Sequence, residues 1–283
     1  MTNTLGEYLR ARREQVAPAD AGIPLTGRRR TPGLRREEVA TLAGISADYY
    51  LRLEQGRDRN PSTQVLESLA RVLGLDAVAT DYLLGLVAPR AAARQRPPRE
   101  VVPTGARLLL DVIGLPAYVE GRTFDVLATN PLAAAIDPSV VVGANRLRSM
   151  FLDPDAQALH PDWEHTTGAI VAGFRSAIGT DVDDPAVAQL VGELSLASEP
   201  FRRLWARADV KPLSGVPVRL RHPAMGDLEL RKEKLLINET DGLLFVVYHA
   251  EPGSETARSL ALLGSLAVSE GVSGEAGAAP SPR

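Results

Sequence analysis

The stretch LRREEVATLAGISADYYLRLEQGRDRNP, which runs from Leu34 to Pro61, decides how the N-terminal part of the chain folds. Apolar residues recur at helical spacing over 35–43, which predicts an amphipathic helix there. Gly44 follows, and glycine ends helices because it enters the left-handed region without steric cost. Ser46 suits the capping position of a second helix that reaches to about residue 55. Two short helices joined by such a turn predict a helix-turn-helix.

Three further helices are expected around this pair. Apolar residues at helical spacing predict them over 3–16, 62–73 and 76–87. The N-terminal region, residues 1–88, is therefore expected to form an all-α bundle of five helices. Between the first two helices, PADAGIPLTGRRRTPG is rich in proline and glycine and predicts a loop.

Charge is distributed unevenly along the 283 residues. Residues 1–99 hold 16 arginines and no lysine against 11 acidic residues, a charge of +5, whereas residues 100–283 carry −8. The sequence pI of 5.9 would argue against nucleic acid, but the local charge decides which partner a domain attracts. With no cysteine, disulfides and thiolate metal sites are excluded. The chain has no apolar run near the ~18 residues of a membrane helix and no signal pattern, so we expect a cytoplasmic, nucleoid-associated protein.

The second half has the composition of a separate domain. Residues 89–103, PRAAARQRPPREVVP, carry proline and arginine with little to bury and predict a linker. Residues 104–267 predict a small α+β domain with helices between two groups of strands. The Gly/Ala/Ser/Pro-rich residues 268–283 are expected to be disordered. Strands are expected at 117–119, 124–128, 216–221, 227–233, 234–238 and 243–249.

Local motifs along most of the chain resemble those of one family. LRREEVA, GIS, YYLRLEQG and NPS are similar to the helix-turn-helix of the lambda-repressor-like XRE regulators. GRRRTPGLRREEVA, LPAYVEGR, FLDP, DW, LVGELS, FRRLWAR, RLRHP and VVYHAEPGS resemble the MmyB-like subfamily. The resemblance implies a lambda-repressor-like domain that binds duplex DNA, followed by a PAS-like ligand-binding domain. It also implies an ion pair between Arg13 and Glu54 that joins the first helix to the recognition helix.

The same resemblance points to residues that contact DNA. Ala47, Asp48 and Arg52 fall at base-reading positions, and the Arg52 guanidinium suits the O6 and N7 atoms of guanine. Asp48 and Arg52 are also four residues apart and can simply pair with each other. The arginines at 28–30 suit phosphate or the minor groove, although charge runs are usually solvated. The full expected set is Arg28, Arg29, Arg30, Arg35, Arg36, Ser46, Ala47, Asp48, Tyr49, Arg52, Arg57, Arg59 and Asn60.

The aromatic residues of the second domain are candidates for a ligand site. Most such residues are core, but apolar cavities with a few polar groups are the usual ligand sites. The resemblance suggests an apolar ligand such as a fatty acid. The candidate set is Phe124, Phe151, Trp163, Phe174, Phe201 and Trp205, with Arg219 and His222 at the polar end.

The expected function is therefore that of a ligand-responsive transcription regulator that binds an operator as a homodimer. No nucleophile–base motif, phosphate-binding loop or metal-ligand spacing stands out, so we expect no enzyme activity, cofactor or metal. Two alternatives stay open. One is a DNA-binding protein whose C-terminal domain only dimerises, and the other is an enzyme fused to a DNA-binding domain.

Overall fold

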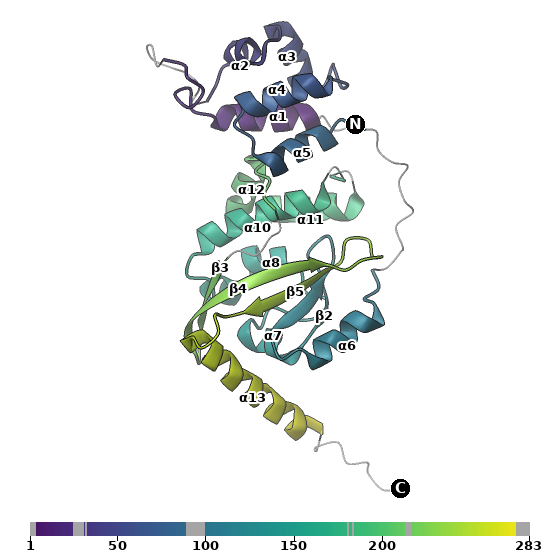
Figure 1. Ribbon diagram of the computed structural model, residues 1–283, viewed down its shortest axis with the longest axis vertical. Coiled ribbons are helices and arrows are strands. Elements are labelled where there is room, and N and C mark those ends of the chain that lie inside the picture. Colours follow the sequence, from purple (N-terminus) through teal and green to yellow (C-terminus); the bar gives the residue numbers. More distant parts are fainter. Residues whose placement is uncertain are drawn as a thin grey trace. The chain divides into compact units, whose positions relative to one another are not determined.

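The chain forms two compact units, which do not follow the sequence in two simple halves (Figure 1). A computed structural model describes residues 4–24, 31, 33–88, 100–179, 181–182, 184–212 and 217–275, with side chains described as far as residue 266. One unit groups Met1–Arg94 with Val171–Pro212, and the other groups Gln95–Ile170 with Leu213–Arg283. Residues 171–212, which we expected within a continuous second domain, thus group with the N-terminal helices.

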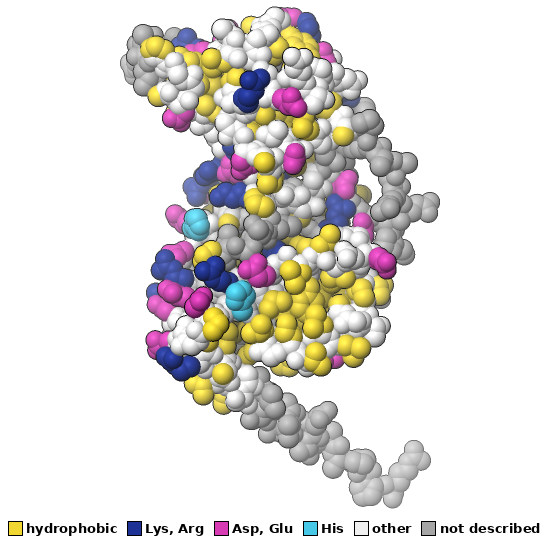
Figure 2. Space-filling view, in the orientation of Figure 1, with side chains coloured by type: hydrophobic (Ala, Val, Ile, Leu, Met, Phe, Trp, Pro, Cys, Tyr) yellow, Lys and Arg dark blue, Asp and Glu magenta, His cyan; other side chains and the backbone are white. Residues whose placement is uncertain are grey.

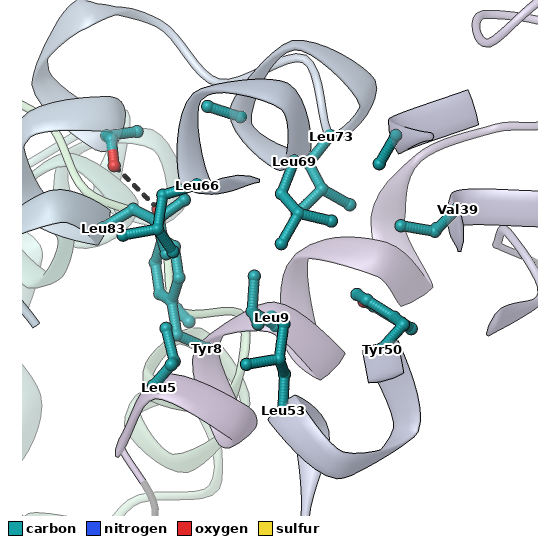
Figure 3. Close-up of a cluster of buried hydrophobic side chains, with 14 of the residues drawn as sticks. Leu5, Tyr8, Leu9, Val39, Tyr50, Leu53, Leu66, Leu69, Leu73 and Leu83 are labelled. Carbon is teal, nitrogen blue, oxygen red and sulfur yellow. Dashed lines mark hydrogen bonds between the residues drawn. The ribbon is translucent and has the colours of Figure 1, made fainter. Parts of the chain in front are cut away.

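The expected helices of the N-terminal region are present. Their apolar faces meet in one core, in which the Tyr8 hydroxyl donates to the carbonyl of Ala79 at 3.3 Å (Figure 3). Leu9, Leu53 and Leu69 lie fully buried in this core. The helices are α1 (Thr4–Gln15), α2 (Arg36–Ala43), α3 (Ala47–Glu54), α4 (Thr63–Val72) and α5 (Ala77–Gly85).

The turn between α2 and α3 has the predicted chemistry. Gly44 lies in the left-handed region, with φ of 71°, and ends α2. The Ser46 hydroxyl accepts a hydrogen bond from the amide of Tyr49 at 3.1 Å, so it caps α3. Because both signals are local, the ends of these helices could be predicted from the sequence.

A buried ion pair joins α1 to α3, the second helix of the helix-turn-helix. The Arg13 Nε lies 2.7 Å from Oε1 of Glu54, and both side chains are almost fully buried. The Arg13 Nη1 also donates to the carbonyl of Leu34 at 2.9 Å. The Arg36 Nε lies 2.5 Å from the other oxygen of Glu54. The expected Arg13–Glu54 pair is confirmed, and its carboxylate links α1, α2 and α3.

Residues 171–212, from the second half of α10 onward, complete the N-terminal unit. The helix α10 spans Trp163–Ile178 and is followed by α11 (Pro185–Ala197) and α12 (Glu199–Ala206). Ala208 and Val210 are buried in the same apolar core as α1. Beside them, the Arg12 Nη1 lies 2.5 Å from Oδ1 of Asp209. The segment after α12 is therefore fixed to α1 by both apolar and ionic contacts.

The second unit is built on one antiparallel sheet, which agrees with the expected α+β domain. Its strands are β1 (Ala117–Glu120), β2 (Val126–Thr129), β3 (Pro217–His222), β4 (Gly226–Leu236) and β5 (Leu244–His249), in the order β2-β1-β5-β4-β3. Val119, Phe245 and Val247 lie in the apolar cluster that α6 (Thr104–Val112) completes on one face. Tyr118, Val246 and Tyr248 alternate with them and face the other side. That second face also receives α7 (Pro131–Ile136) and α13 (Glu255–Glu275).

Four local predictions need correction. The two strands expected at 227–233 and 234–238 form the single strand β4, because their alternation continues unbroken opposite β5. Phe124 does not lie on a strand but in a turn, with φ of 65°, before β2. A short helix, α9 (Pro154–Ala158), which directly follows α8 (Arg146–Leu152), was not predicted. The last helix continues through 268–275, where disorder was expected, and 276–283 lie outside the described residues.

Replacing Glu54 by alanine should destabilise the protein by about 3–5 kcal/mol, because it leaves Arg13 buried without its counter-charge. Urea unfolding of the full chain measures this change. Arg10→Ala is the matched control, since Arg10 pairs with Glu14 on the exposed surface and its loss should cost less than about 1 kcal/mol. Equal effects of the two substitutions would show that the Glu54 pair does not hold the helices together.

Candidate DNA-reading surface and candidate ligand site

The expected base-reading residues form the exposed surface of α3. Ala47 and Asp48 lie in its first turn and Arg52 one turn later, and all three are exposed, whereas Tyr50 and Leu53 are fully buried. The helix therefore anchors one face in the core and presents the other outward, as a recognition helix must.

The structure brings Arg52 and Asp48 together. The Arg52 Nη1 donates to Oδ2 of Asp48, and its guanidinium lies 5.6 Å from the centre of the Tyr49 ring. Nearly half of the Arg52 side chain is nevertheless exposed. The pair and a role in base reading are compatible, because Asp48 can hold the guanidinium toward the solvent side of α3.

The residues expected to contact the sugar–phosphate backbone differ in their exposure and in their partners within the protein. Arg35, Arg57, Arg59 and Asn60 are exposed, and the Arg59 Nε donates to the carbonyl of Gly56 at 3.1 Å. Arg36 is half-buried and pairs with Glu54, so its positive charge is partly neutralised within the protein. Arg28, Arg29 and Arg30 lie outside the described residues.

The six aromatic candidates are divided between the two units. Phe151 and Trp163 pack edge to face in the second unit, with ring centres 5.8 Å apart. Trp205 stacks on Phe201 at 6.0 Å in the N-terminal unit, where Phe174 also contacts it. In that unit the Arg175 guanidinium covers the Trp205 ring at 3.8 Å. Sequence alone does not reveal which of two cores a buried aromatic residue joins.

The two polar candidates point to opposite faces of β3. His222 is buried, with Nε2 2.9 Å from the carbonyl of Ala135 and Nδ1 accepting from the amides of Ala224 and Met225. Arg219 is exposed and lies 3.1 Å from Asp162. Both side chains thus have partners within the protein, and the structure does not bring them together at one polar end.

A different group of charged residues gathers on the face of the sheet that carries Tyr118 and Tyr248. Lys232 lies opposite Tyr248 in the ladder, Lys234 opposite Val246, and Glu120 opposite Leu244. Directly paired residues share a face of a sheet, so all three side chains leave on this side. Asp137, Arg146 and His160, from the segments that cover the face, are close enough to change the pKa of Lys232 or of one another.

Four members of this cluster form two ion pairs. The Arg146 Nη2 lies 2.7 Å from Oδ2 of Asp137, and both side chains are buried. Arg146 also donates to the Ser139 hydroxyl at 2.5 Å, and the Asp137 pKa is lowered by the Arg146 charge despite its burial. Lys234 pairs with Glu120, both buried, and its Nζ lies 4.3 Å from the centre of the Phe124 ring. These charges are compensated within the fold.

His160 and Lys232 are not compensated in this way. Neither ring nitrogen of His160, which is 6% exposed, has a hydrogen-bond partner among the described residues. Burial lowers the pKa of His160 to about 4, so the ring is neutral at pH 7. Lys232 is half-buried and makes no ion pair with any described residue, and burial together with the Lys234 charge lowers its pKa to about 7. Buried polar atoms in native proteins nearly always have partners, so the two His160 nitrogens mark a place where a partner is missing, and Lys232 is close enough to influence the pKa of that ring.

One signal in the sequence could have indicated Lys232 and Lys234. The strand reads GDLELRKEKLL, in which Leu228, Leu230, Lys232 and Lys234 alternate. A period of two places all four on one face, and two lysines that continue an apolar stripe are unusual for a core face. The opposing Asp137, Arg146 and His160 carry no such signal, because their approach depends on the tertiary fold.

Comparison with protein families is consistent with this architecture. The family model described as helix-turn-helix domain matches residues 4–83. The family model described as MmyB-like transcription regulator ligand binding domain matches residues 101–263, which is more than half of the chain. Among curated proteins, none matches the chain. No helix in the described part of the chain is long and apolar enough to cross a membrane. The chain belongs to the MmyB-like transcription regulators, with a helix-turn-helix DNA-binding domain ahead of the ligand-binding domain.

Proposed function

We propose that this regulator reads an operator through α3 and changes its DNA affinity when the second unit binds a small molecule with an apolar body and an anionic head, such as a fatty acid. The observation that carries the ligand proposal is the uncompensated pair His160 and Lys232. The family match supports a ligand-binding role without naming the ligand.

The charges of the cluster favour an anion. Arg146 and Lys234 are balanced by Asp137 and Glu120, and His160 is neutral, so whenever Lys232 is protonated the cluster holds three positive charges against two negative ones. A carboxylate beside Lys232 would balance this count. It would also accept hydrogen bonds from the lysine and, in one tautomer, from the His160 ring, and charge-assisted hydrogen bonds of this kind are the stronger ones.

The neighbouring residues favour an apolar body behind that head. Leu228 and Leu230 precede Lys232 on the same face of β4, and Val246 lies on the same face of β5. A molecule with one charged end and a hydrocarbon chain matches the chemistry of this face, which is ionic at one end and apolar along the rest, and the three apolar residues are fully buried in the present packing.

On the DNA side, the proposal assigns Arg52 to base reading, with Ala47 and Asp48 beside it. The remaining described members are proposed as backbone contacts. They are Arg35 and Arg36 at the start of α2, Ser46 at the cap of α3, Tyr49 in its first turn, and Arg57, Arg59 and Asn60 just after it. The arginines at 28–30 are proposed as further phosphate contacts. Exposure of most of the described members supports these roles.

Arg52→Ala should reduce specificity more than general affinity, by on the order of 1–3 kcal/mol at one base pair in each half-site. Selecting sites from random duplex DNA with wild type and variant measures the preference. Arg57→Ala is the contrasting variant, because loss of a phosphate contact should weaken all sequences alike. If wild type and Arg52→Ala select the same bases with equal preference, Arg52 serves only as the partner of Asp48.

Decanoate should bind the full chain, and decan-1-ol, which lacks the charge, should bind at least about tenfold more weakly. Lys232→Met should remove most of this difference because it keeps the length of the side chain and deletes its charge. Arg231→Met is the matched control, since Arg231 is the exposed neighbour on the opposite face of β4. Calorimetric titration measures binding, and the affinity for DNA selected by the wild type is then compared with and without decanoate.

The outcomes separate the alternatives. Equal affinity for acid and alcohol, or for wild type and Lys232→Met, would contradict the anionic head. No binding of either compound and no effect on DNA affinity would favour a C-terminal domain that only dimerises. Chemical change of the bound compound during incubation would favour the enzyme alternative.

His160 should make the stability depend on pH between about 4 and 6.5. In this window the unfolded chain binds a proton at His160 and the folded chain does not, so stability falls as the pH falls, by at most about 1.4 kcal/mol per pH unit. Lys232, with a pKa of about 7 in the folded chain, alters the stability only above this pH window. Asp137, whose pKa is lowered, alters it only below the window. His160→Phe should flatten the slope measured by urea unfolding, whereas His165→Phe, at an exposed position, should leave it unchanged. The same slope in wild type and His160→Phe would show that the ring is not held neutral.

A further inference from the structure

A stretch inside the match to the ligand-binding family contacts α1 of the helix-turn-helix domain. This stretch, residues 171–212, is called the arm, and it belongs to the same compact unit as α1, although the chain on both sides of it belongs to the second unit. Near the end of the arm, Ala208 and Val210 are buried in the core that α1 and α5 share. Between them, Asp209 pairs with Arg12 of α1 at 2.5 Å. The arm therefore supports α1 from a part of the chain that is distant in sequence.

The contact between the arm and α1 leaves buried polar atoms without partners. The Arg12 Nε, the Arg175 Nε and the Tyr82 hydroxyl have no hydrogen-bond partner among the described residues. Burial raises the pKa of Tyr8 to about 12, and all three of these side chains also act on that pKa, so they lie close to the Tyr8 hydroxyl. Each such atom loses the water that it binds when exposed, and native cores rarely leave such atoms unpaired. The docked arm is therefore less stable than its apolar contacts alone would make it.

Arg175 adds a buried charge to the same contact. It is 8% exposed and makes no ion pair with any described residue. Its Nη2 donates to the carbonyl of Trp205 at 2.7 Å, and its guanidinium lies over the ring of that residue. A carbonyl and an aromatic ring compensate a guanidinium only in part, whereas water hydrates it fully. Because Arg175 lies close to Tyr8, separation of the arm from α1 would let water reach this charge, which favours release.

The ion pair between Arg12 and Asp209 opposes release. Figure 2 shows charged side chains of both signs on the exposed surface around α10 and α12, where water screens them. The Arg12 and Asp209 side chains are instead only 19% and 26% exposed, so water screens their pair less. Asp209 also binds the Nε of Arg207 at 2.9 Å, and removal of its charge would leave both arginines without this counter-ion. One carboxylate thus holds a contact that buried, unpaired atoms weaken.

We propose that the arm is a releasable brace: docked on α1 it keeps the helix-turn-helix in its DNA-binding arrangement, and its release lowers the affinity for DNA. The coupling runs through α1, because Arg13, next to Arg12, pairs with Glu54 at the end of α3. Such a brace has two states, and anything that stabilises one of them shifts DNA binding. The arm begins within α10, whose first residue, Trp163, follows His160 by three positions, so the chain at the proposed ligand site leads directly into it. That last link alone rests on the proposed function.

Asp209→Asn should release the arm, because the amide keeps the shape of the side chain and deletes its charge. The affinity of the full chain for DNA selected by the wild type should fall about fivefold or more. Backbone amides of α1 and of residues 205–212 should exchange hydrogen faster, whereas those of β5 should keep their rate. Glu199→Gln is the matched control, since it removes an exposed ion pair with Arg203 from the same arm and should change neither measurement. Unchanged exchange in Asp209→Asn, or faster exchange with unchanged affinity, would overturn the brace.

A cross-link tests the brace in the opposite direction. The chain has no cysteine, so Gln15→Cys and Arg207→Cys introduce the only two thiols. Both positions are exposed, and the Gln15 side chain donates to the carbonyl of Arg207, so a short bismaleimide can join them. In the Asp209→Asn background, linking should restore the wild-type affinity for DNA and the slow exchange of α1, and a linked chain whose affinity stays low would contradict the brace. Because exchange is measured without DNA or decanoate, failure of the brace is distinguishable from failure of the proposed function.

Discussion

The arrangement of α1, α2 and α3 in the helix-turn-helix domain depends on the carboxylate of Glu54. It sits at the end of the recognition helix and is shared by Arg13 on α1 and Arg36 on α2. A buried carboxylate is costly to leave unpaired, so the three helices are held in one arrangement rather than a range of packings. The arrangement fixes which face of α3 is exposed, and therefore which side chains are available to DNA.

The sheet of the second unit also buries charged residues, but not all of them have a partner within the protein. Its face toward α7 and α13 is apolar at Leu228 and Leu230 and becomes ionic at Lys232 and Lys234. Arg146 with Asp137 and Lys234 with Glu120 satisfy each other, as buried charges must. Lys232 and His160 remain without partners among the described residues, and the proposed carboxylate ligand would supply a partner for both.

Much of the fold could be predicted because its signals are local. Caps such as Ser46, the left-handed Gly44 and apolar periodicity lie within a few residues of the helix ends they determine. The ligand site could not be predicted in the same way. The distribution of Phe174, Phe201 and Trp205 to one unit and of Phe151 and Trp163 to the other is decided by tertiary packing. The pairing of Arg219 with Asp162 likewise has no signature in spacing.

Residues 171–212 belong both to the part of the chain that matches the ligand-binding family and to the compact unit of the helix-turn-helix. They fall inside the family match of 101–263, yet Ala208 and Val210 are buried in the core that α1 helps to form. On one side α1 is held through Arg13 by Glu54 of α3, and through the adjacent Arg12 it is held by Asp209. A ligand changes DNA affinity only if it binds two states of the chain unequally. Because neighbouring residues of α1 bind both segments, a state in which 171–212 shifts must also change the support of the recognition helix.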